Sequence, residues 1–347
     1  MKIVYLFSNF HLARLTAQPK IGLELAQKAR QKGEKIFVIS NGLKTKAFKK
    51  NNIDFLIFSG PADLKTYFFN LFLIIKYLKK VKPDIIHVHG SLLIVYIWFV
   101  NCFLRIPLVC SLCETLDIMS AFQQKLLVFC LKQSKKVFVS CEYIKSQLIK
   151  KGLNADKIET ARIGLDNNFL AKKNDFSFDA DILYFGDSSE ERGFDIICRL
   201  AKKLPRFRFK ILLRWKQKNC LNQLKKMKNL KNVVVLNHPY KQSLKKMILK
   251  SKLVILPYRW MGVRPPLSLI ESMALGKCVI TSKMKGNEEI VKNEVNGFMF
   301  NFNQLKYVIA EIKKLIADNQ AREAMGQKAK ETIKQMYSSQ EYNKILK

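Results

Sequence analysis

The sequence lacks the long apolar segments that mark membrane-spanning or secreted chains. Its longest apolar run is Leu92–Val100, extended past Asn101 to Leu104, which is shorter than the roughly 20 residues that span a bilayer. The first residues, Met1–Phe7, form only a short apolar run, without the longer stretch and the small-residue cleavage site of a signal peptide. We therefore expect a cytoplasmic protein that does not cross a membrane.

Regularly spaced cysteines are also absent. The 8 cysteines are irregularly placed, and disulfide frameworks belong mainly to short secreted chains, so we expect reduced thiols. Cys110 and Cys113 form a single C-x-x-C, but structural zinc normally takes four ligands from paired motifs. Asp179-Ala180-Asp181 is spaced like a metal–nucleotide element, yet it precedes a strand, so we interpret it as a strand-entry turn. We predict no metal site.

Acidic residues are scarce. The chain has 62 Lys and Arg against 27 Asp and Glu, a formal net charge of +35, and the stretch Ile196–Ile270 contains 20 Lys or Arg and no Asp or Glu. This excess favours an anionic partner such as nucleotide phosphates, nucleic acid or an acidic membrane surface. No zinc-finger or RRM signature supports nucleic acid. A general lysine bias on helix surfaces would produce the same stretch, so both interpretations stay open.

What the sequence contains is ordinary for a two-domain globular chain: 347 residues, 48% apolar and 26% charged. Short β-rich runs alternate with helical patterns, among them Leu64–Leu78 as one aromatic-rich amphipathic helix. This alternation predicts parallel sheets with helices on both faces. We predict an N-terminal domain over 1–165, a linker over 166–180, a C-terminal domain over 181–320 and a helical tail over 321–347 that packs back towards the N-terminal domain. The expected site is a cleft at the carboxyl ends of the strands.

One loop and the helix after it carry the most chemical information. Arg264-Pro265-Pro266 leads into a helix whose first backbone N–H groups, on Leu267 and Ser268, form an anion site through unpaired donors and the helix dipole. Glu271 falls in the first turns of this helix, where it can accept hydrogen bonds from a ribose diol or simply stabilise its own helix.

The motifs around this loop resemble the donor-binding signature of GT-B glycosyltransferases, most closely the retaining enzymes of family 4. The resemblance spans nearly the whole chain and implies two Rossmann-like domains that face each other across a cleft, with a C-terminal helical tail. The segments that carry it are Pro83–Ser91, Ser140–Leu148, Ile163–Asp166, Tyr184–Gly186, Glu191–Asp195, Arg264–Ile280, Lys285–Val291 and Asn296–Phe298.

The resemblance implies that the C-terminal half binds the donor. Glu271 matches the residue that binds the ribose, and Arg192 takes the place of a lysine on the diphosphate. Two positions depart from the family pattern: Val263 replaces a Glu that normally helps to hold the donor sugar, and Asp187 stands near a usual Arg. We infer that Arg214 or Lys216, at the end of the next strand, supplies the missing cation. The predicted donor residues are Gly186, Arg192, Arg214, Lys216, Arg264, Leu267, Ser268 and Glu271.

The N-terminal half, which the resemblance assigns to the acceptor, departs as well. The loop Ser8–Lys20 has no glycine, and Cys113-Glu114 stands where relatives often carry a His. His87 and His89 share one side of a strand. We favour His89 because it lies at the strand's carboxyl end, and we predict His89 and Glu114 as the catalytic residues.

These features predict a hexosyltransferase-type glycosyltransferase that takes a UDP- or GDP-linked sugar as co-substrate, retains the anomeric configuration and needs no metal or other cofactor. The acceptor is expected to be a glycan or a lipid-linked molecule of cell-envelope glycan, glycolipid or glycoprotein synthesis. The apolar stretch Tyr67–Ile75, with lysines after it, favours peripheral contact with an anionic membrane at its inner face. A sugar-nucleotide epimerase of the same fold and a non-catalytic partner protein remain alternatives.

Overall fold

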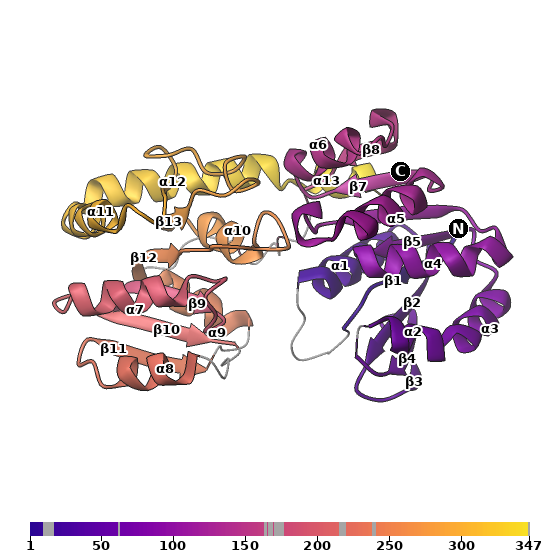
Figure 1. The fold of residues 1–347 in the computed structure, drawn as a ribbon, viewed down its shortest axis with the longest axis horizontal. Helices are drawn as coiled ribbons and strands as arrows, with labels where there is room; N and C mark the ends of the chain where they lie inside the picture. The colour runs from indigo at the N-terminus through magenta and orange to yellow at the C-terminus, as the bar shows by residue number, and fades with distance from the viewer. Residues whose placement is uncertain are drawn as a thin grey trace. The chain divides into compact units, whose positions relative to one another are not determined.

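The computed structural model describes residues 1–9, 17–61, 63–162, 165, 169, 177–214, 220–237 and 241–345. The chain forms two compact units, each built on its own sheet (Figure 1). Unit 1 comprises Met1–Gly164, Gly262–Arg264 and Ser339–Lys347, and unit 2 comprises Leu165–Met261 and Pro265–Ser338. The short segment Gly262–Arg264 thus belongs to unit 1, whereas the sequence placed it inside the C-terminal domain.

Unit 1 contains an eight-stranded sheet in the order β3-β4-β2-β1-β5-β6-β7-β8. All neighbours are parallel except the pair β3–β4. The inner strands are continuous apolar runs because helices cover them on both faces. The strands are β1 (Lys2–Leu6), β2 (Lys35–Gly42), β3 (Lys46–Lys50), β4 (Ile53–Ser59), β5 (Ile85–His89), β6 (Leu108–Leu112), β7 (Lys136–Val139) and β8 (Ile158–Thr160).

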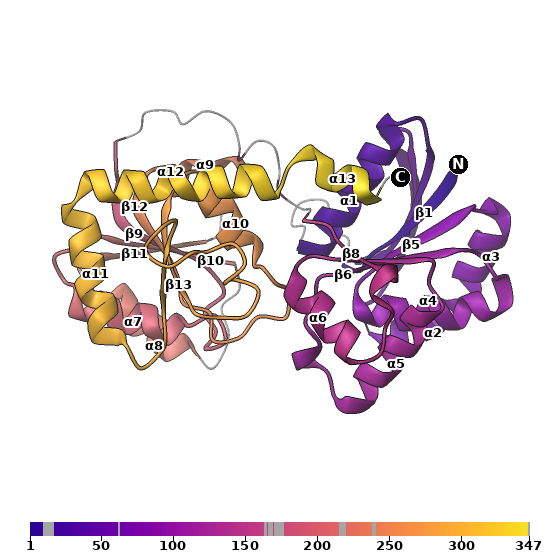
Figure 2. The same cartoon turned by 90° about the horizontal axis from the view of Figure 1, so that it is seen from above.

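Two helical layers cover this sheet. Helices α2–α6 pack on one face around Ile74, Ile97 and Leu127, and α1 and α13 pack on the other face (Figure 2). The helices are α1 (Ala17–Gln31), α2 (Leu64–Phe69), α3 (Leu71–Val81), α4 (Ser91–Leu104), α5 (Ala121–Lys132), α6 (Glu142–Lys150) and α13 (Ser339–Ile345). In the part of the chain that the structure describes, no helix combines the length and the apolar character needed to cross a membrane.

The single helix predicted over Leu64–Leu78 is wrong, because the chain forms two helices that meet at Asn70. Asn70 ends α2 and starts α3, with a backbone conformation outside the helical region. Its side-chain Nδ2 donates to the Thr66 carbonyl oxygen at 2.8 Å, and such a local hydrogen bond competes with continuation of the helix.

Unit 2 contains a six-stranded parallel sheet in the order β11-β10-β9-β12-β13-β14. Its strands are β9 (Ala180–Gly186), β10 (Phe209–Leu213), β11 (Val233–Asn237), β12 (Ser251–Leu256), β13 (Cys278–Ser282) and β14 (Phe298–Phe300). Its helices are α7 (Phe194–Lys203), α8 (Leu221–Lys228), α9 (Lys241–Leu249), α10 (Leu267–Ala274), α11 (Leu305–Ala317) and α12 (Asn319–Met336).

The helical tail differs from the prediction in where it packs. Most of it is α12, which lies against α10 and β13 in unit 2, and only Ser339–Lys347 belongs to unit 1. The close packing of α12 depends on Gly326, where an added Cβ would lie 2.2 Å from the Gly276 carbonyl oxygen.

Each sheet has one point at which the strand order reverses, between β1 and β5 in unit 1 and between β9 and β12 in unit 2. Ligands of open parallel sheets bind outside the carboxyl ends of the strands at this point. In unit 1 these ends carry Phe7–Asn9 and His89–Ser91, and in unit 2 they carry Gly186–Gly193 and Pro257–Met261.

Candidate functional site

A glycine holds the loop after β9 against the end of β12. Gly193 has a φ of +69° and serves as the N-cap of α7. A Cβ at this position would lie 1.8 Å from the Pro257 carbonyl oxygen, so no side chain fits. The close approach of these two segments fixes the loop Asp187–Arg192 at the reversal point of the unit 2 sheet.

Arg192 extends from this loop as a partly buried cation. Its Nε lies 3.6 Å from the Asp187 carboxylate, and its guanidinium stands 5.9 Å from the centre of the Tyr258 ring and contacts the Met261 sulfur. The side chains of Arg192 and Asp187 are 31% and 21% exposed, so part of each faces solvent. Asp187 therefore orients Arg192 while it offsets some of its charge.

Tyr258 connects this loop to the start of α10. Its hydroxyl is hydrogen-bonded to the Ser268 hydroxyl in the first turn of the helix, and Ser282 donates to the Tyr258 carbonyl oxygen. Burial raises the pKa of Tyr258 to about 12, Arg192 and Arg214 act in the opposite direction, and Glu271 adds to the rise. The tyrosine is therefore neutral, and three of the predicted charged donor residues lie close enough to act on it.

The other donor residues of unit 2 that the structure describes follow the carboxyl ends of its strands. Gly186 ends β9, and its carbonyl oxygen accepts a hydrogen bond from the Arg214 N–H at 2.8 Å. The Arg214 side chain is exposed. Glu271 is 9% exposed on α10, which begins at Leu267 after Pro266. Lys216 lies outside the described residues.

In unit 1, the two histidines of β5 have different surroundings. His87 Nε2 lies 2.8 Å from the Ser111 hydroxyl, as expected of a packed and hydrogen-bonded residue. His89 is stacked on His87 with ring centres 4.4 Å apart, and within the described parts of the chain its buried Nε2 has no hydrogen-bond partner. Burial lowers the pKa of His89 to about 3, so its ring is neutral at physiological pH.

Glu114 follows β6, the neighbour of β5, and its side chain reaches the start of α4. Its carboxylate accepts a hydrogen bond from the Ser91 N–H at 3.2 Å, in the first turn of that helix. The backbone of Glu114 pairs with Val263 in an isolated antiparallel bridge. The two predicted catalytic residues are thus brought to neighbouring strand ends, and Val263 lies in the same unit as both.

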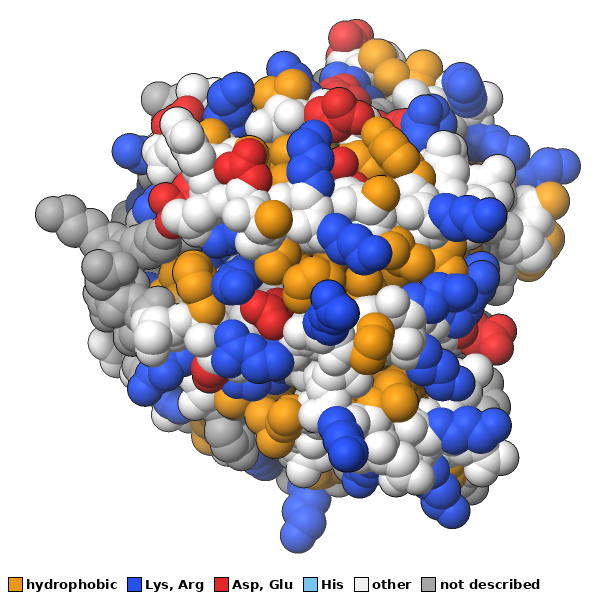
Figure 3. Space-filling view, turned by 90° about the vertical axis from the view of Figure 1, so that its left-hand side faces the viewer, with side chains coloured by type: hydrophobic (Ala, Val, Ile, Leu, Met, Phe, Trp, Pro, Cys, Tyr) orange, Lys and Arg blue, Asp and Glu red, His pale blue; other side chains and the backbone are white. Residues whose placement is uncertain are grey.

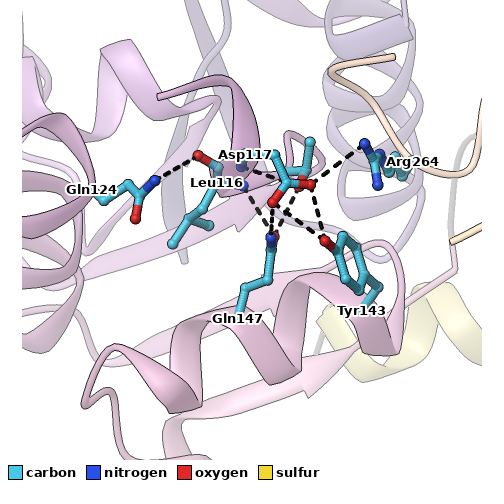
Figure 4. Close-up of polar contacts among 7 residues, drawn as sticks. Leu116, Asp117, Gln124, Tyr143, Gln147 and Arg264 are labelled. Atoms are coloured by element: carbon cyan, nitrogen blue, oxygen red, sulfur yellow. Dashed lines mark hydrogen bonds and ion pairs between the residues drawn. The ribbon is translucent and has the colours of Figure 1, made fainter. Parts of the chain in front are cut away.

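Arg264 is held by residues of unit 1 (Figure 4). Its guanidinium lies 3.5 Å from the Asp117 carboxylate and 5.3 Å from the centre of the Tyr143 ring. Its backbone N–H donates to the Cys113 carbonyl oxygen at 3.1 Å, and its carbonyl oxygen accepts from the Ser140 hydroxyl at 2.5 Å. Arg264 is only 6% exposed, so this buried cation is fixed by its carboxylate and aromatic partners, and its donor role stays a prediction.

Two family models match the chain. Residues 22–169 match glycosyltransferase family 4, and residues 166–332 match glycosyl transferases group 1. The chain belongs to the GT-B glycosyltransferases.

Two uncharacterized glycosyltransferases of Methanocaldococcus jannaschii are similar in sequence. The first is 25% identical over 201 residues, which are 58% of this chain and 55% of that protein. The second is 34% identical over 83 residues, which are 23% of this chain and 21% of that protein. The match therefore spans little more than half the length of the first relative and a much smaller part of the second.

Solved structures agree with the fold of this glycosyltransferase. Anabaena HepE, in complex with UDP-glucose, has a TM-score of 0.80 at 17% identity, over 100% of this chain and 98% of that one. Sucrose-phosphate synthase from Thermosynechococcus elongatus has a TM-score of 0.79 at 12% identity, over 99% and 97% of the two chains. The prediction of two Rossmann-like domains followed by C-terminal helices is confirmed.

Two residues of the glycosyltransferase site were missed in the sequence. Tyr258 comes just after Pro257 at the end of β12, and this place next to the reversal point was the available signal. Asp117 follows β6 and accepts hydrogen bonds from Gln147 at 2.6 Å and from the Tyr143 hydroxyl at 3.0 Å. Its pairing with Arg264, 147 positions along the chain, had no local signal.

The two motifs that are spaced like metal sites, Asp179–Asp181 and the C-x-x-C of Cys110 and Cys113, have other roles in the structure. Asp179 pairs with Lys210 at 2.7 Å and Asp181 with Lys252 at 3.0 Å. Burial raises the pKa values of the Cys110 and Cys113 thiols to about 12, which keeps both protonated. Within the described ranges, no group of three or more His, Cys, Asp or Glu is arranged to hold a metal ion.

Proposed function

We propose that this glycosyltransferase moves a sugar from a UDP- or GDP-linked donor to a glycan or lipid-linked acceptor, with retention of configuration. The observation that carries the proposal is the gathering of Arg192, Arg214, Ser268 and Glu271 around Tyr258, at the reversal point of the unit 2 sheet. Cations, a helix start and a carboxylate in one place match the chemistry of a nucleoside diphosphate, whose phosphates are anionic and whose ribose carries hydroxyl donors.

Donor cleavage leaves negative charge on the departing diphosphate. Preorganised cations and N–H groups stabilise such charge as it develops, without reorganisation during the reaction. Arg192, oriented by Asp187, and Arg214 supply the cations, and the first N–H groups of α10, at Leu267 and Ser268, supply the dipole. The Glu271 carboxylate accepts hydrogen bonds from the ribose hydroxyls.

The acceptor is assigned to unit 1, at the reversal point next to β5. A neutral His89 acts there as a hydrogen-bonding partner of an acceptor hydroxyl, since a ring whose pKa is about 3 carries no charge at pH 7. Glu114 positions the start of α4 through the Ser91 N–H. We extend the proposal to peripheral contact with an anionic membrane at its inner, cytoplasmic face.

The proposed transfer needs no metal, because Arg192, Arg214 and the start of α10 provide the charge stabilisation that a divalent ion supplies in other transferases. Chelation with EDTA should leave the rate unchanged. Loss of activity in EDTA that returns with Mg²⁺ or Mn²⁺ would remove this part of the proposal.

The test is a product analysis with radiolabelled UDP- and GDP-sugars, first alone and then with a lipid extract and with soluble glycans. Release of nucleoside diphosphate together with a labelled acceptor, and an anomer of the donor's configuration by NMR, is the expected result. Conversion of the donor sugar without acceptor identifies an epimerase instead, and no turnover of any donor identifies a non-catalytic protein.

A further inference from the structure

The outer surface of α2–α5 in unit 1 is rich in exposed aromatic rings. Six phenylalanines on these helices are more than half exposed, and every exposed phenylalanine within the described residues lies on these four helices. The six are Phe68, Phe69, Phe72, Phe99, Phe103 and Phe122. Soluble proteins rarely leave several large aromatic side chains in water on one helical layer. We therefore expect an apolar partner to cover this surface.

The four helices themselves carry charge of only one sign, although the exposed Asp63 caps the start of α2. None of the four helices contains Asp or Glu, and α4 has no charged residue over its 14 positions. Six lysines lie on the other three helices, and all six are exposed: Lys65, Lys76, Lys79, Lys80, Lys125 and Lys132. We call these six phenylalanines and six lysines the Phe–Lys face. A surface helix of a soluble protein normally mixes both charges on its outer side.

The four helices form one layer. They cover the same face of the unit 1 sheet, opposite α1 and α13 (Figures 1 and 2). Helix α4 contacts α5 as well as α2 and α3, so it joins the others into a continuous surface. The Phe–Lys face is therefore a property of one side of unit 1.

We propose that the Phe–Lys face docks unit 1 onto the surface of an anionic lipid bilayer. Phenylalanine rings enter the boundary between headgroups and acyl chains, and lysines next to them contact anionic headgroups. Because the helices themselves carry no carboxylate and Asp63 stands only at the start of α2, little repulsion opposes an anionic surface. Each lysine close to such a surface strengthens binding about fivefold, so the lysines select the lipid charge while the rings provide insertion.

The acid-free stretch Ile196–Ile270 of unit 2 is the weaker candidate for this contact. On the face of unit 2 that Figure 3 views, Lys and Arg side chains are scattered between neutral and apolar ones. Helix α8 exposes Lys225, Lys226 and Lys228, but its one large exposed apolar side chain is Leu221. This stretch has charge without a group of rings that could insert.

Helix α4 connects the docking face to the acceptor residues. It begins at Ser91, whose N–H binds Glu114, and Phe103 follows twelve residues later, about 18 Å along the helix axis. This inference rests on the proposed function, because a docked unit 1 then holds His89 and Glu114 within reach of a lipid-linked acceptor in the same bilayer.

The test is co-sedimentation of the full chain with two kinds of vesicle, phosphatidylcholine alone and phosphatidylcholine mixed with phosphatidylglycerol. Wild type should bind the anionic vesicles much more tightly than the neutral ones. The triple variant Phe68→Gln, Phe69→Gln, Phe72→Gln should bind at least tenfold more weakly. The triple variant Lys76→Gln, Lys79→Gln, Lys80→Gln should lose about 100-fold, from about fivefold per lysine.

The matched control is Lys225→Gln, Lys226→Gln, Lys228→Gln, which removes the same charge from α8 and should stay within twofold of wild type. Equal loss in the control and in the lysine variant of the face overturns the proposal, as does wild-type binding by the phenylalanine variant. A wild type that ignores both vesicles also overturns it and leaves a protein as the occupant. Nucleotide-induced stabilisation of each variant, measured in parallel, reports on folding and on the donor proposal separately.

Discussion

At the scale of single residues, we expect donor binding to depend on how Asp187 and Arg192 share their charge. Asp187 reverses the charge expected at its position, yet the structure shows it 3.6 Å from Arg192 rather than facing away. A partly exposed ion pair of this kind contributes only about 0–1 kcal/mol to stability. Its effect on function is larger in our account, because the carboxylate competes with a diphosphate for the same guanidinium.

The variant Asp187→Asn should therefore bind nucleoside diphosphate more tightly, by about three- to fivefold, since Arg192 loses its competitor. Isothermal titration with UDP and GDP measures the change. Asp179→Asn is the control, because Asp179 pairs with Lys210 just before β9, at the opposite edge of the same sheet. Weaker binding by Asp187→Asn, with the control unchanged, would mean that the orientation Asp187 gives to Arg192 outweighs the charge that it offsets.

The buried histidines predict a specific acid sensitivity. An unfolded His takes up a proton at a pKa of about 6.5, whereas burial lowers the pKa of His89 to about 3 and also lowers that of His87. Their contribution to stability is complete above pH 6.5 and is lost as the pH falls from there towards the folded-state value. At pH 5.5 the loss for His89 is about 1.4 kcal/mol, and His87 acts in the same direction.

Urea unfolding at pH 7.5 and pH 5.5 tests this point. The fall in the free energy of unfolding between the two pH values should be smaller in His89→Gln than in wild type by about 1.4 kcal/mol. An identical fall in both proteins would show that His89 is protonated in the folded state.

At the scale of elements, local sequence patterns predict the strands and helices that depend on residues close together in the chain. Continuous apolar runs predict strands over Leu108–Leu112 and Phe209–Leu213, and the structure forms strands with these bounds. The edge strand β3 was missed because its sequence, Lys-Ala-Phe-Lys-Lys, buries only part of Phe48. Strands β8 and β14 have three residues each, which is too short for an apolar or alternating pattern to predict a strand.

The candidate site was predictable to the same extent. The residues on one strand end or helix start, such as Arg192 and Glu271, could be named from motif order. The position of Arg264 could not be predicted in this way. It depends on backbone pairing of Gly262–Arg264 with Cys113–Thr115, which are far apart in sequence. Pairing over such separations leaves no trace in local periodicity.

Gly193 gives the prediction that belongs to this scale. Gly193→Ala should destabilise unit 2 by several kcal/mol and abolish nucleotide binding, because the new methyl meets the Pro257 carbonyl oxygen. Gly33→Ala is the matched control: its φ is also positive, at +91°, but nothing lies within 4 Å of the added Cβ, so it should cost only about 1–2 kcal/mol and leave binding intact. Thermal unfolding with and without nucleotide measures both, and equal losses in the two variants would contradict the close approach.

At the scale of the whole molecule, the chain contributes its last helix to the unit in which it started. Within unit 1, the Arg162 N–H donates to the Glu341 carboxylate at 2.9 Å, and Lys344 donates to the Thr160 carbonyl oxygen at 3.3 Å. Ile345 packs against the α1 side of the unit 1 core. The segment Ser339–Lys347 thus stabilises unit 1 although it follows unit 2 in sequence.

Removal of residues 339–347 should therefore lower the stability of unit 1 by about 1–3 kcal/mol and leave unit 2 unchanged. Hydrogen exchange followed by mass spectrometry separates the two: amides of β8 and α1 should exchange faster, and those of β9 and β12 should keep their protection. Equal loss of protection in both units would argue against the assignment of this segment to unit 1.

A donor site on α10 is best tested by nucleotide-induced thermal stabilisation of wild type and Glu271→Gln, with UDP, GDP and their sugars. A ligand that binds only the folded chain raises its unfolding temperature by mass action. We predict a rise with one nucleotide in wild type, absent from Glu271→Gln and retained in the control Glu159→Gln, whose carboxylate pairs with Lys136 at 3.3 Å on β8 of unit 1. Equal rises in all three proteins, or none in wild type with any nucleotide, would contradict a donor site built on α10.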